Sequence, residues 1–169
     1  MKERIKTTLE KTIGLTLTRT TRAANMECLK FGQHFITDKV DGELNIGEFG
    51  IHLQCPWRIT NGQKILIGSF DVYEQADQNA KYDPDFDWDR PNVNLRDNNL
   101  NKLIENVKLT VEKIDADDFG GFEIIFNDNY TLTTFPATSI TGEYWRLLDN
   151  RPNMEKHFVV SGDGIWESA

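Results

Sequence analysis

The sequence predicts an α+β protein: a largely antiparallel, strongly curved sheet or half-barrel of about seven or eight strands, with two short helices. Apolar residues recur at helical spacing in only two segments. Most other segments are rich in β-branched and aromatic residues and are separated by short polar turns. Short turns favour antiparallel neighbours, because a parallel pair of strands needs a long crossover.

The first helix is expected over residues 1–13, because Ile5, Leu9 and Ile13 recur every four residues and form a narrow apolar stripe. The second helix is expected to begin at Asp97, whose carboxylate suits an N-cap. Its apolar stripe consists of Leu100, Leu103, Ile104 and Val107.

The strands are predicted from alternation of apolar and polar residues. "LTLTRT" and "MECLKF" form a hairpin around "RAAN". In "FGIHLQC" we expect Phe49, Ile51, Leu53 and Cys55 to share the core face, with His52 on the other. "KILIGSF" follows an Asn-Gly turn and predicts a central strand. Further strands are expected in "KLTVEKI", "GFEIIF", "YTLTTF", "EYWRLLD" and "KHFVVSG".

Length and composition predict one folded domain over residues 1–169, since 38% of the residues are hydrophobic and eighteen are Phe, Tyr or Trp. The net charge of −8 disfavours nucleic acid and anionic membranes as partners. The start of the chain lacks the apolar core of a signal peptide. No apolar run approaches the roughly 20 residues that cross a bilayer. A soluble, cytoplasmic protein is expected, with Cys28 and Cys55 as free thiols.

No metal, cofactor or catalytic residue is predicted. His52 and Cys55 have a spacing that could begin a zinc site, but a structural zinc ion needs four nitrogen or sulfur ligands. "DPDFDWDRPNVN" starts like an EF-hand loop, yet Trp88 takes the place of the required glycine and Asn94 that of the required glutamate. The sequence also contains no nucleophile-elbow, metalloprotease or nucleotide-binding motif.

The first candidate binding surface is a long acidic excursion over residues 71–96. Asp83, Asp85, Asp87 and Asp89 alternate with other residues there, and Trp88 could supply an aromatic anchor. Long ordered connections often carry function, so a basic protein partner is expected to meet this surface. The structural alternative is an edge segment in which Trp88 packs inward and the aspartates stay solvated.

The second candidate is a pocket inside the curved sheet, formed by His52, Arg58 and Arg146. A guanidinium held over an indole ring can meet a carboxylate, and "WR" occurs twice, at residues 57–58 and 145–146. Such a pocket would make the chain a small-molecule-binding protein or an enzyme. The same pairs also suit purely structural roles at strand ends.

Four segments, "TRAANMECLKFG", "FGIHLQCPWRI", "ILIGSFD" and "EYWRLL...HFVVSGDG", together resemble a group of uncharacterised bacterial proteins. That group combines an "RAA-aliphatic" hairpin with "LH-QCPWR" and a late "WRL...HFVV". The resemblance implies a bacterial, stand-alone cytoplasmic protein and assigns no catalytic residues. In size, acidity and α+β pattern the chain is also similar to immunity proteins of toxin systems. These observations predict a non-enzymatic protein-binding module.

Overall fold

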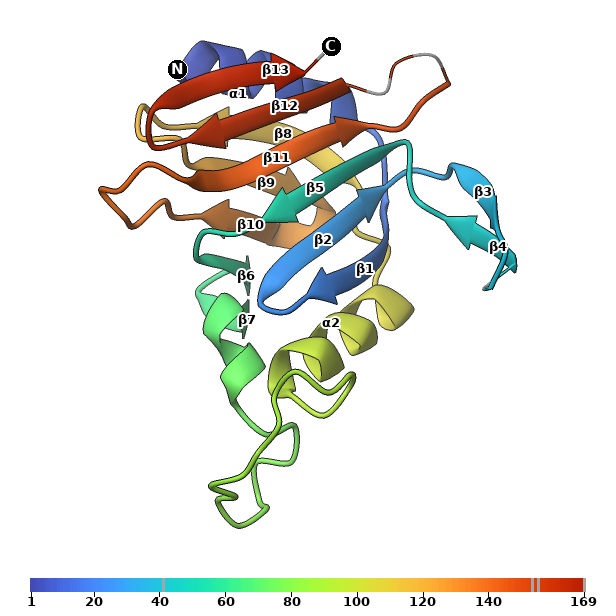
Figure 1. Cartoon of the computed structure of the whole chain (residues 1–169), viewed down its shortest axis with the longest axis vertical. Helices are drawn as coiled ribbons and strands as arrows, with labels where there is room; N and C mark the ends of the chain where they lie inside the picture. Colours follow the sequence, from blue (N-terminus) through green and yellow to red (C-terminus); the bar gives the residue numbers. More distant parts are fainter. Residues whose placement is uncertain (41, 153, 155, 169) are drawn as a thin grey trace.

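The computed structural model describes residues 1–40, 42–152, 154 and 156–168, which form an α+β fold with two α-helices and thirteen strands (Figure 1). All strand pairs among these residues are antiparallel. The predicted class and the antiparallel pairing are therefore confirmed. The predicted seven or eight strands are wrong, and so is the strongly curved half-barrel.

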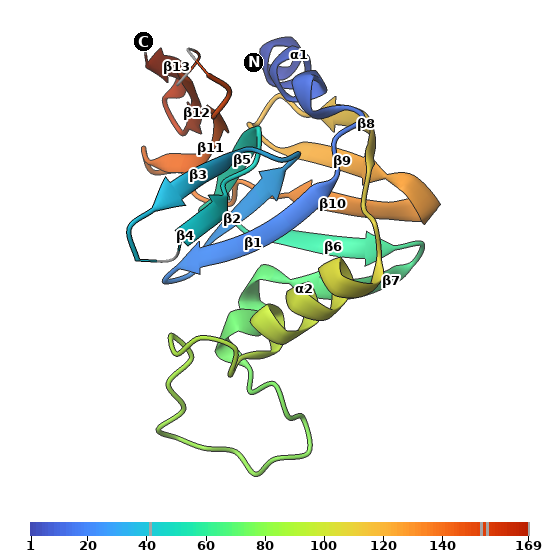
Figure 2. The ribbon, with the colours of Figure 1, turned by 90° about the vertical axis from the view of Figure 1, so that its right-hand side faces the viewer.

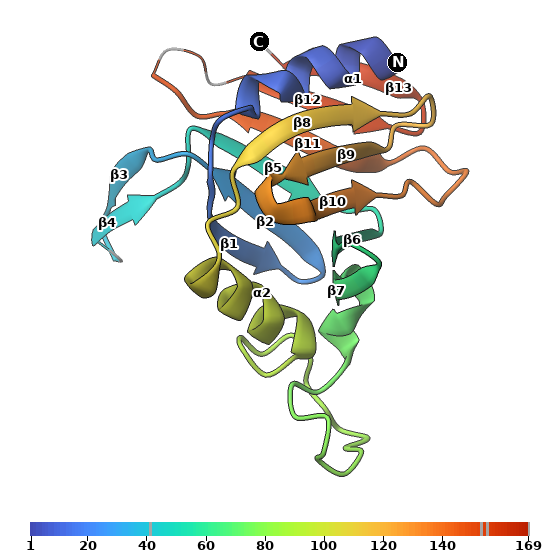
Figure 3. The same ribbon diagram turned by 180° about the vertical axis from the view of Figure 1, so that it is seen from behind.

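The strands form two larger sheets and one separate hairpin. The six-stranded sheet has the order β1-β2-β5-β11-β12-β13 (Figure 1). Its strands are β1 (Leu17–Ala23), β2 (Met26–Phe31), β5 (Phe49–Leu53), β11 (Glu143–Asp149), β12 (Lys156–Ser161) and β13 (Gly164–Ser168). The five-stranded sheet has the order β7-β6-β10-β9-β8, seen from behind in Figure 3. Its strands are β6 (Trp57–Asn61), β7 (Lys64–Gly68), β8 (Val111–Ala116), β9 (Phe122–Phe126) and β10 (Tyr130–Thr134). The hairpin pairs β3 (Phe35–Asp38) with β4 (Gly42–Asn45).

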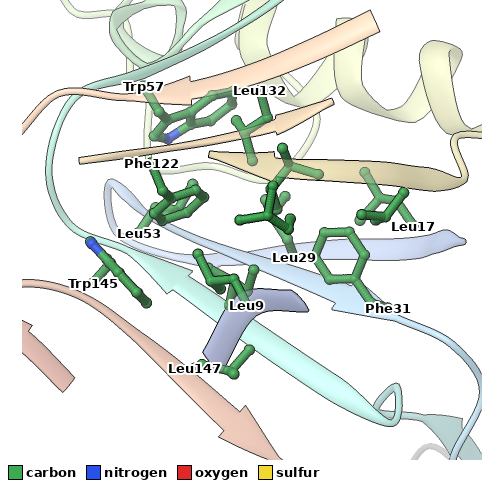
Figure 4. Close-up of a cluster of buried hydrophobic side chains, with 14 of the residues drawn as sticks. Leu9, Leu17, Leu29, Phe31, Leu53, Trp57, Phe122, Leu132, Trp145 and Leu147 are labelled. Carbon is green, nitrogen blue, oxygen red and sulfur yellow. The ribbon is translucent and has the colours of Figure 1, made fainter. Parts of the chain in front are cut away.

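The two sheets pack face to face around one hydrophobic core (Figure 4). Leu29, Leu53 and Leu147 project from one sheet, and Phe122 and Leu132 from the other. The chain crosses between the sheets just after β5, where the backbone N–H groups of residues 54 and 55 both donate to the Tyr144 carbonyl. Stacking two sheets encloses a core without strong curvature, which is why the half-barrel is not needed.

The helices lie along the open edges between the two sheets (Figures 2 and 3). Helix α1 (Lys2–Leu9) packs on β8, and helix α2 (Leu95–Asn106) packs on β1 and β7. Ile5 and Leu9 of α1 and Leu100 of α2 are buried in the core. No helix in the described ranges is long and apolar enough to cross a membrane.

Both helices differ from the prediction at one end. Helix α1 stops at Leu9 and a 3₁₀ turn follows (Glu10–Thr12), so Ile13 leaves the apolar stripe and is 46% exposed. Helix α2 begins before Asp97, because the Asn94 side chain is the N-cap and accepts a hydrogen bond of 2.8 Å from the Asp97 backbone N–H. The Asp97 carboxylate is thereby left for another partner.

Strand β7 is also placed differently from the prediction. Its apolar run suggested a central strand, but β7 lies at an edge of the five-stranded sheet. Ile65 is consequently 58% exposed, whereas Ile67 is buried. An apolar run alone does not separate a central strand from an edge strand that a helix partly covers.

Trp145 joins the two sheets. Its ring lies 4.7 Å, centroid to centroid, from that of Phe122 in the opposite sheet. Its Nε1–H donates a buried hydrogen bond of 2.7 Å to the Gly120 carbonyl. The side chain is fully buried.

We expect Trp145→Phe to lower the free energy of unfolding by about 1–3 kcal/mol, because it leaves the Gly120 carbonyl buried without a donor. Trp145→Ala should cost about 3–5 kcal/mol, because it also opens a cavity. Urea unfolding of both variants measures these losses. Trp166→Phe, at a half-exposed position, is the control and should stay within about 0.5 kcal/mol of the parent. Equal stability of Trp145→Phe and the parent would contradict the bridging role.

Candidate functional site

The predicted excursion is an ordered loop with a closed neck. After a 3₁₀ turn (Ser69–Tyr73), Gln75 and Asn94 form an antiparallel bridge. The Ala76 N–H donates to the Val93 carbonyl at 3.0 Å, and the Leu95 N–H donates to the Glu74 carbonyl at 2.8 Å. Residues 76–93, here called the acidic loop, extend away from the sheets beyond α2 (Figure 2). The neck holds the two ends of the acidic loop side by side.

Arg22 of β1 holds the root of the acidic loop. Its Nε–H donates to both carboxylate oxygens of Asp97 at 3.0 Å, and its Nη1 donates to Asp89 at 2.7 Å. Its Nη2 reaches the backbone carbonyls of residues 88, 89 and 90 at 2.9–3.2 Å. One half-buried guanidinium therefore ties together the sheet edge, the first turn of α2 and the end of the loop.

The structure separates Asp89 from the other predicted binding aspartates. Asp89 forms an ion pair with Arg22 and belongs to the root of the loop. Asp83, Asp85 and Asp87 are exposed, and none of them forms an ion pair with a described residue. Asp83 and Asp87 each accept a hydrogen bond from the backbone N–H two residues later, which orders the tip.

The aromatic residues of this region divide into a packed group and an exposed tip. Trp88 is partly buried and lies edge-on to Tyr73, with ring centroids 5.1 Å apart. Its indole thus contacts the segment before the loop, as the structural alternative expected. Tyr82 is 86% exposed. Sequence reasoning missed Tyr82, although it stands directly before the run of alternating aspartates.

A cleft of about 600 Å³ lies beside the loop root, between the edge strand β1 and the N-terminal part of α2. Threonine and asparagine side chains, Arg19 and the ion pairs of Arg22 make most of its wall polar. The wall includes Arg19, Thr20, Arg22, Glu27, Asn92 and Asn101. Such a cleft could hold a small polar molecule.

Glu27, on β2, is the buried acid of this cleft. It is 2% exposed and lies 3.2 Å from the Nε of Arg96, which is fully buried on α2. Arg96 Nη1 donates to the carbonyls of Asn25 and Ser69. The geometry between Glu27 Oε2 and Arg96 Nε fits an ion pair but not a hydrogen bond, and Arg96 Nη2 has no partner within the described part of the chain.

Burial raises the pKa of Glu27 from its ordinary 4.5 to about 7, although the charge of Arg96 offsets part of this effect. Burial likewise lowers the pKa of Arg96. The raised pKa of Glu27 and the lowered pKa of Arg96 both show that the cost of burying the charges outweighs the attraction between the two side chains. A carboxyl group that titrates near neutral pH can give or take a proton under physiological conditions.

The structure does not bring His52, Arg58 and Arg146 into one pocket. His52 and Arg146 are cross-strand partners on the outer face of the six-stranded sheet, and Arg146 pairs with Glu143. Arg58 is exposed on the five-stranded sheet, where its Cζ lies 4.8 Å from the ring centroid of Phe135. Because His52 and Arg146 lie on the outer face of one sheet and Arg58 is exposed on the other, the three side chains do not line the interior pocket that the sequence suggested.

The two cysteines are free and buried. Burial raises the pKa of the Cys55 thiol to about 12, which makes it a poor nucleophile at neutral pH. Across residues 1–40, 42–152, 154 and 156–168, no group of three His, Cys, Asp or Glu side chains is placed to hold a metal ion.

Comparison of the chain with family models, curated proteins and solved structures finds no match. The resemblance to the bacterial group with the "LH-QCPWR" segment stays a prediction. The acidic loop and the cleft beside it are the two features that bear on function.

The raised pKa of Glu27 makes stability depend on pH. The folded state keeps the Glu27 proton up to about pH 7, whereas the unfolded chain releases it near 4.5. The stability contributed by this proton is fully present below pH 4.5, and it is lost as the pH rises through 7. We expect the free energy of unfolding to fall over this interval in the parent. Glu27→Gln should remove that fall, because an amide does not titrate.

Urea unfolding of both proteins at several pH values across this interval provides the measurement. The quantity compared is the slope of the free energy of unfolding with pH. An overall loss of stability in Glu27→Gln does not change that slope. Parallel pH profiles for the two proteins would show that Glu27 is already ionised throughout the interval.

Proposed function

We propose that this chain is a non-enzymatic protein-binding module that presents the acidic loop to a basic partner, as an immunity protein presents an acidic surface to a toxin. The observation that carries the proposal is the contrast within the loop. Asp89 is neutralised by Arg22 at the root, whereas Asp83, Asp85 and Asp87 are exposed at the tip without ion pairs among the described residues. The root provides anchoring, and the tip provides charge for a partner.

The order of the loop favours binding. A loop that is already held by its neck and by Arg22 loses less conformational entropy when a partner docks. Unpaired carboxylates at the tip attract a basic surface and raise the association rate, an effect that salt weakens. Tyr82 supplies exposed aromatic area of the kind found at binding hot spots.

The proposal places the protein in the bacterial cytoplasm and excludes nucleic acid as its partner. Two free thiols in one chain suit a reducing compartment. The net charge of −8 suits a basic protein partner better than a polyanion.

The second candidate is a small-molecule-binding protein or an enzyme, now centred on the cleft between β1 and α2. One observation favours it: Glu27 lines the cleft with a pKa of about 7 and incomplete hydrogen bonding. Asn101→Trp separates the two candidates, because Asn101 is exposed on the cleft wall and outside the acidic loop tip. Filling the cleft should leave partner binding unchanged if the loop is the site.

The main test compares three baits in capture experiments from the source cell. The loop variant carries Asp83→Asn, Asp85→Asn and Asp87→Asn and keeps Asp89, so the Arg22 anchor is intact. The charge-matched control changes three exposed acids elsewhere: Glu10→Gln, Glu105→Gln and Glu112→Gln. We expect parent and control to retain the same basic protein, and the loop variant to lose it.

At low salt, the captured protein should associate about tenfold or more slowly with the loop variant than with the parent. The association rate of the loop variant should also depend less on salt concentration. Stopped-flow mixing measures both quantities. An acidic captured protein, or equal association rates for loop variant and parent, would place the binding surface elsewhere.

A further inference from the structure

We infer that the outer face of the six-stranded sheet is a second docking surface, which binds an acidic polypeptide segment. This inference goes beyond the proposed function, because it concerns a surface outside the acidic loop and a partner of opposite charge. Of the residues on this surface, Arg19 also lines the cleft between β1 and α2. The surface, here called the basic face, contains five basic side chains from five neighbouring strands: Arg19, Lys30, His52, Arg146 and His157.

The strand register brings these residues together in two adjacent rows. One row runs across the sheet through Arg19, Lys30, Gly50, Leu148 and His157. The next row runs through Thr21, Cys28, His52, Arg146, Val159 and Trp166. Their sequence neighbours on the other face, such as Leu29, Ile51 and Leu147, fill the core. The five basic residues therefore point away from the core on one side of the sheet.

Few carboxylates oppose these charges. Glu143, which pairs with Arg146, is the one acid that forms an ion pair with the basic face among the described residues. Burial, and after it the charge of Arg19, lowers the pKa of Lys30. Burial together with Lys30 and Arg146 lowers the pKa of His52. The positive charges of Arg19 and Lys30 thus lie close enough to disfavour each other, and a bound carboxylate would relieve that repulsion.

The basic face also carries the features of a protein-binding surface. Trp166 ends the second row on the edge strand β13 and is 51% exposed. Tryptophan and arginine are the side chains most enriched at interaction hot spots. At the side of the β3–β4 hairpin lies a groove of about 360 Å³, whose lining includes His34, Ile36, His157 and Asp149, the last of which is paired with Arg151. The face therefore offers charge, an aromatic side chain and a wall at one end.

An acidic polypeptide segment fits this surface better than a nucleic acid does. Four strand spacings separate Arg19 from His157, about 19 Å, which an extended segment of about six residues spans. A short segment can meet the basic face alone. A long polyanion would also meet the exposed aspartates of a chain whose net charge is −8.

The test uses the complete chain and a short synthetic peptide of alternating glutamate and threonine residues, titrated by tryptophan fluorescence at low salt. Arg19→Gln with Lys30→Gln removes two charges from the basic face. Arg58→Gln with Lys113→Gln removes the same charges from exposed positions on the five-stranded sheet and is the matched control. We expect the first pair to weaken binding about tenfold or more and the control to stay within about twofold.

Trp166→Ala changes no charge and should also weaken peptide binding. Calorimetry measures this variant, because it lacks the exposed tryptophan that reports binding by fluorescence. Unchanged melting temperatures would show that all variants fold. The inference would be overturned if the two double variants lost peptide affinity equally, or if the parent did not bind the peptide. Tighter binding of an oligothymidylate of equal charge would identify nucleic acid as the occupant instead. A further outcome is that the parent self-associates at low salt and that Arg19→Gln with Lys30→Gln abolishes this association. This result would identify a second copy of the chain as the occupant and would contradict the inference.

Discussion

The guanidinium of Arg22 is the interaction on which the placement of the acidic loop depends. It binds Asp97 in the first turn of α2, Asp89 at the end of the loop, and three successive loop carbonyls. Because Arg22 itself sits on the edge strand β1, it fixes the loop relative to the sheets. It also stands in the wall of the cleft that contains Glu27. A charged hydrogen bond contributes about 1.5–3 kcal/mol, so its loss would loosen both features together.

The positions of the charged side chains on the surface indicate the kind of partner better than the net charge does. The same chain holds three aspartates on one loop that form no ion pair with a described residue, and five basic side chains on one sheet face. The packing of two sheets makes this separation possible, because the outer face of the six-stranded sheet is free of helices, which lie along the edges between the sheets (Figures 2 and 3). Two surfaces of opposite sign can therefore serve two different partners.

Local patterns predicted the strands and the acidic loop well, because alternation and turn residues are local properties. The hairpin β9–β10, with Asp128 and Asn129 at positive φ, is one example. Alternation does not say which strands pair, so the division into two sheets could not be predicted. Strands β3, β4, β6 and β13 were missed. Most residues of β3, β4 and β13 are exposed or half-buried and carry no core pattern. Strand β6 was not predicted although its buried Trp57 and Ile59 alternate with an exposed residue. The basic face was missed because its members are distant in sequence and meet only through strand pairing.

The most direct test of the central claim, that Arg22 holds the acidic loop in place, is amide hydrogen exchange of the complete parent chain and of Arg22→Gln. The amides of Ala76 and Leu95 close the neck of the loop and should be protected in the parent. In Arg22→Gln their exchange should accelerate about tenfold or more, because a charged hydrogen bond worth about 1.5–3 kcal/mol is lost. The amides of Ile51 and Leu147 in the sheet should keep their protection. Unchanged exchange at Ala76 and Leu95 in Arg22→Gln would contradict the claim.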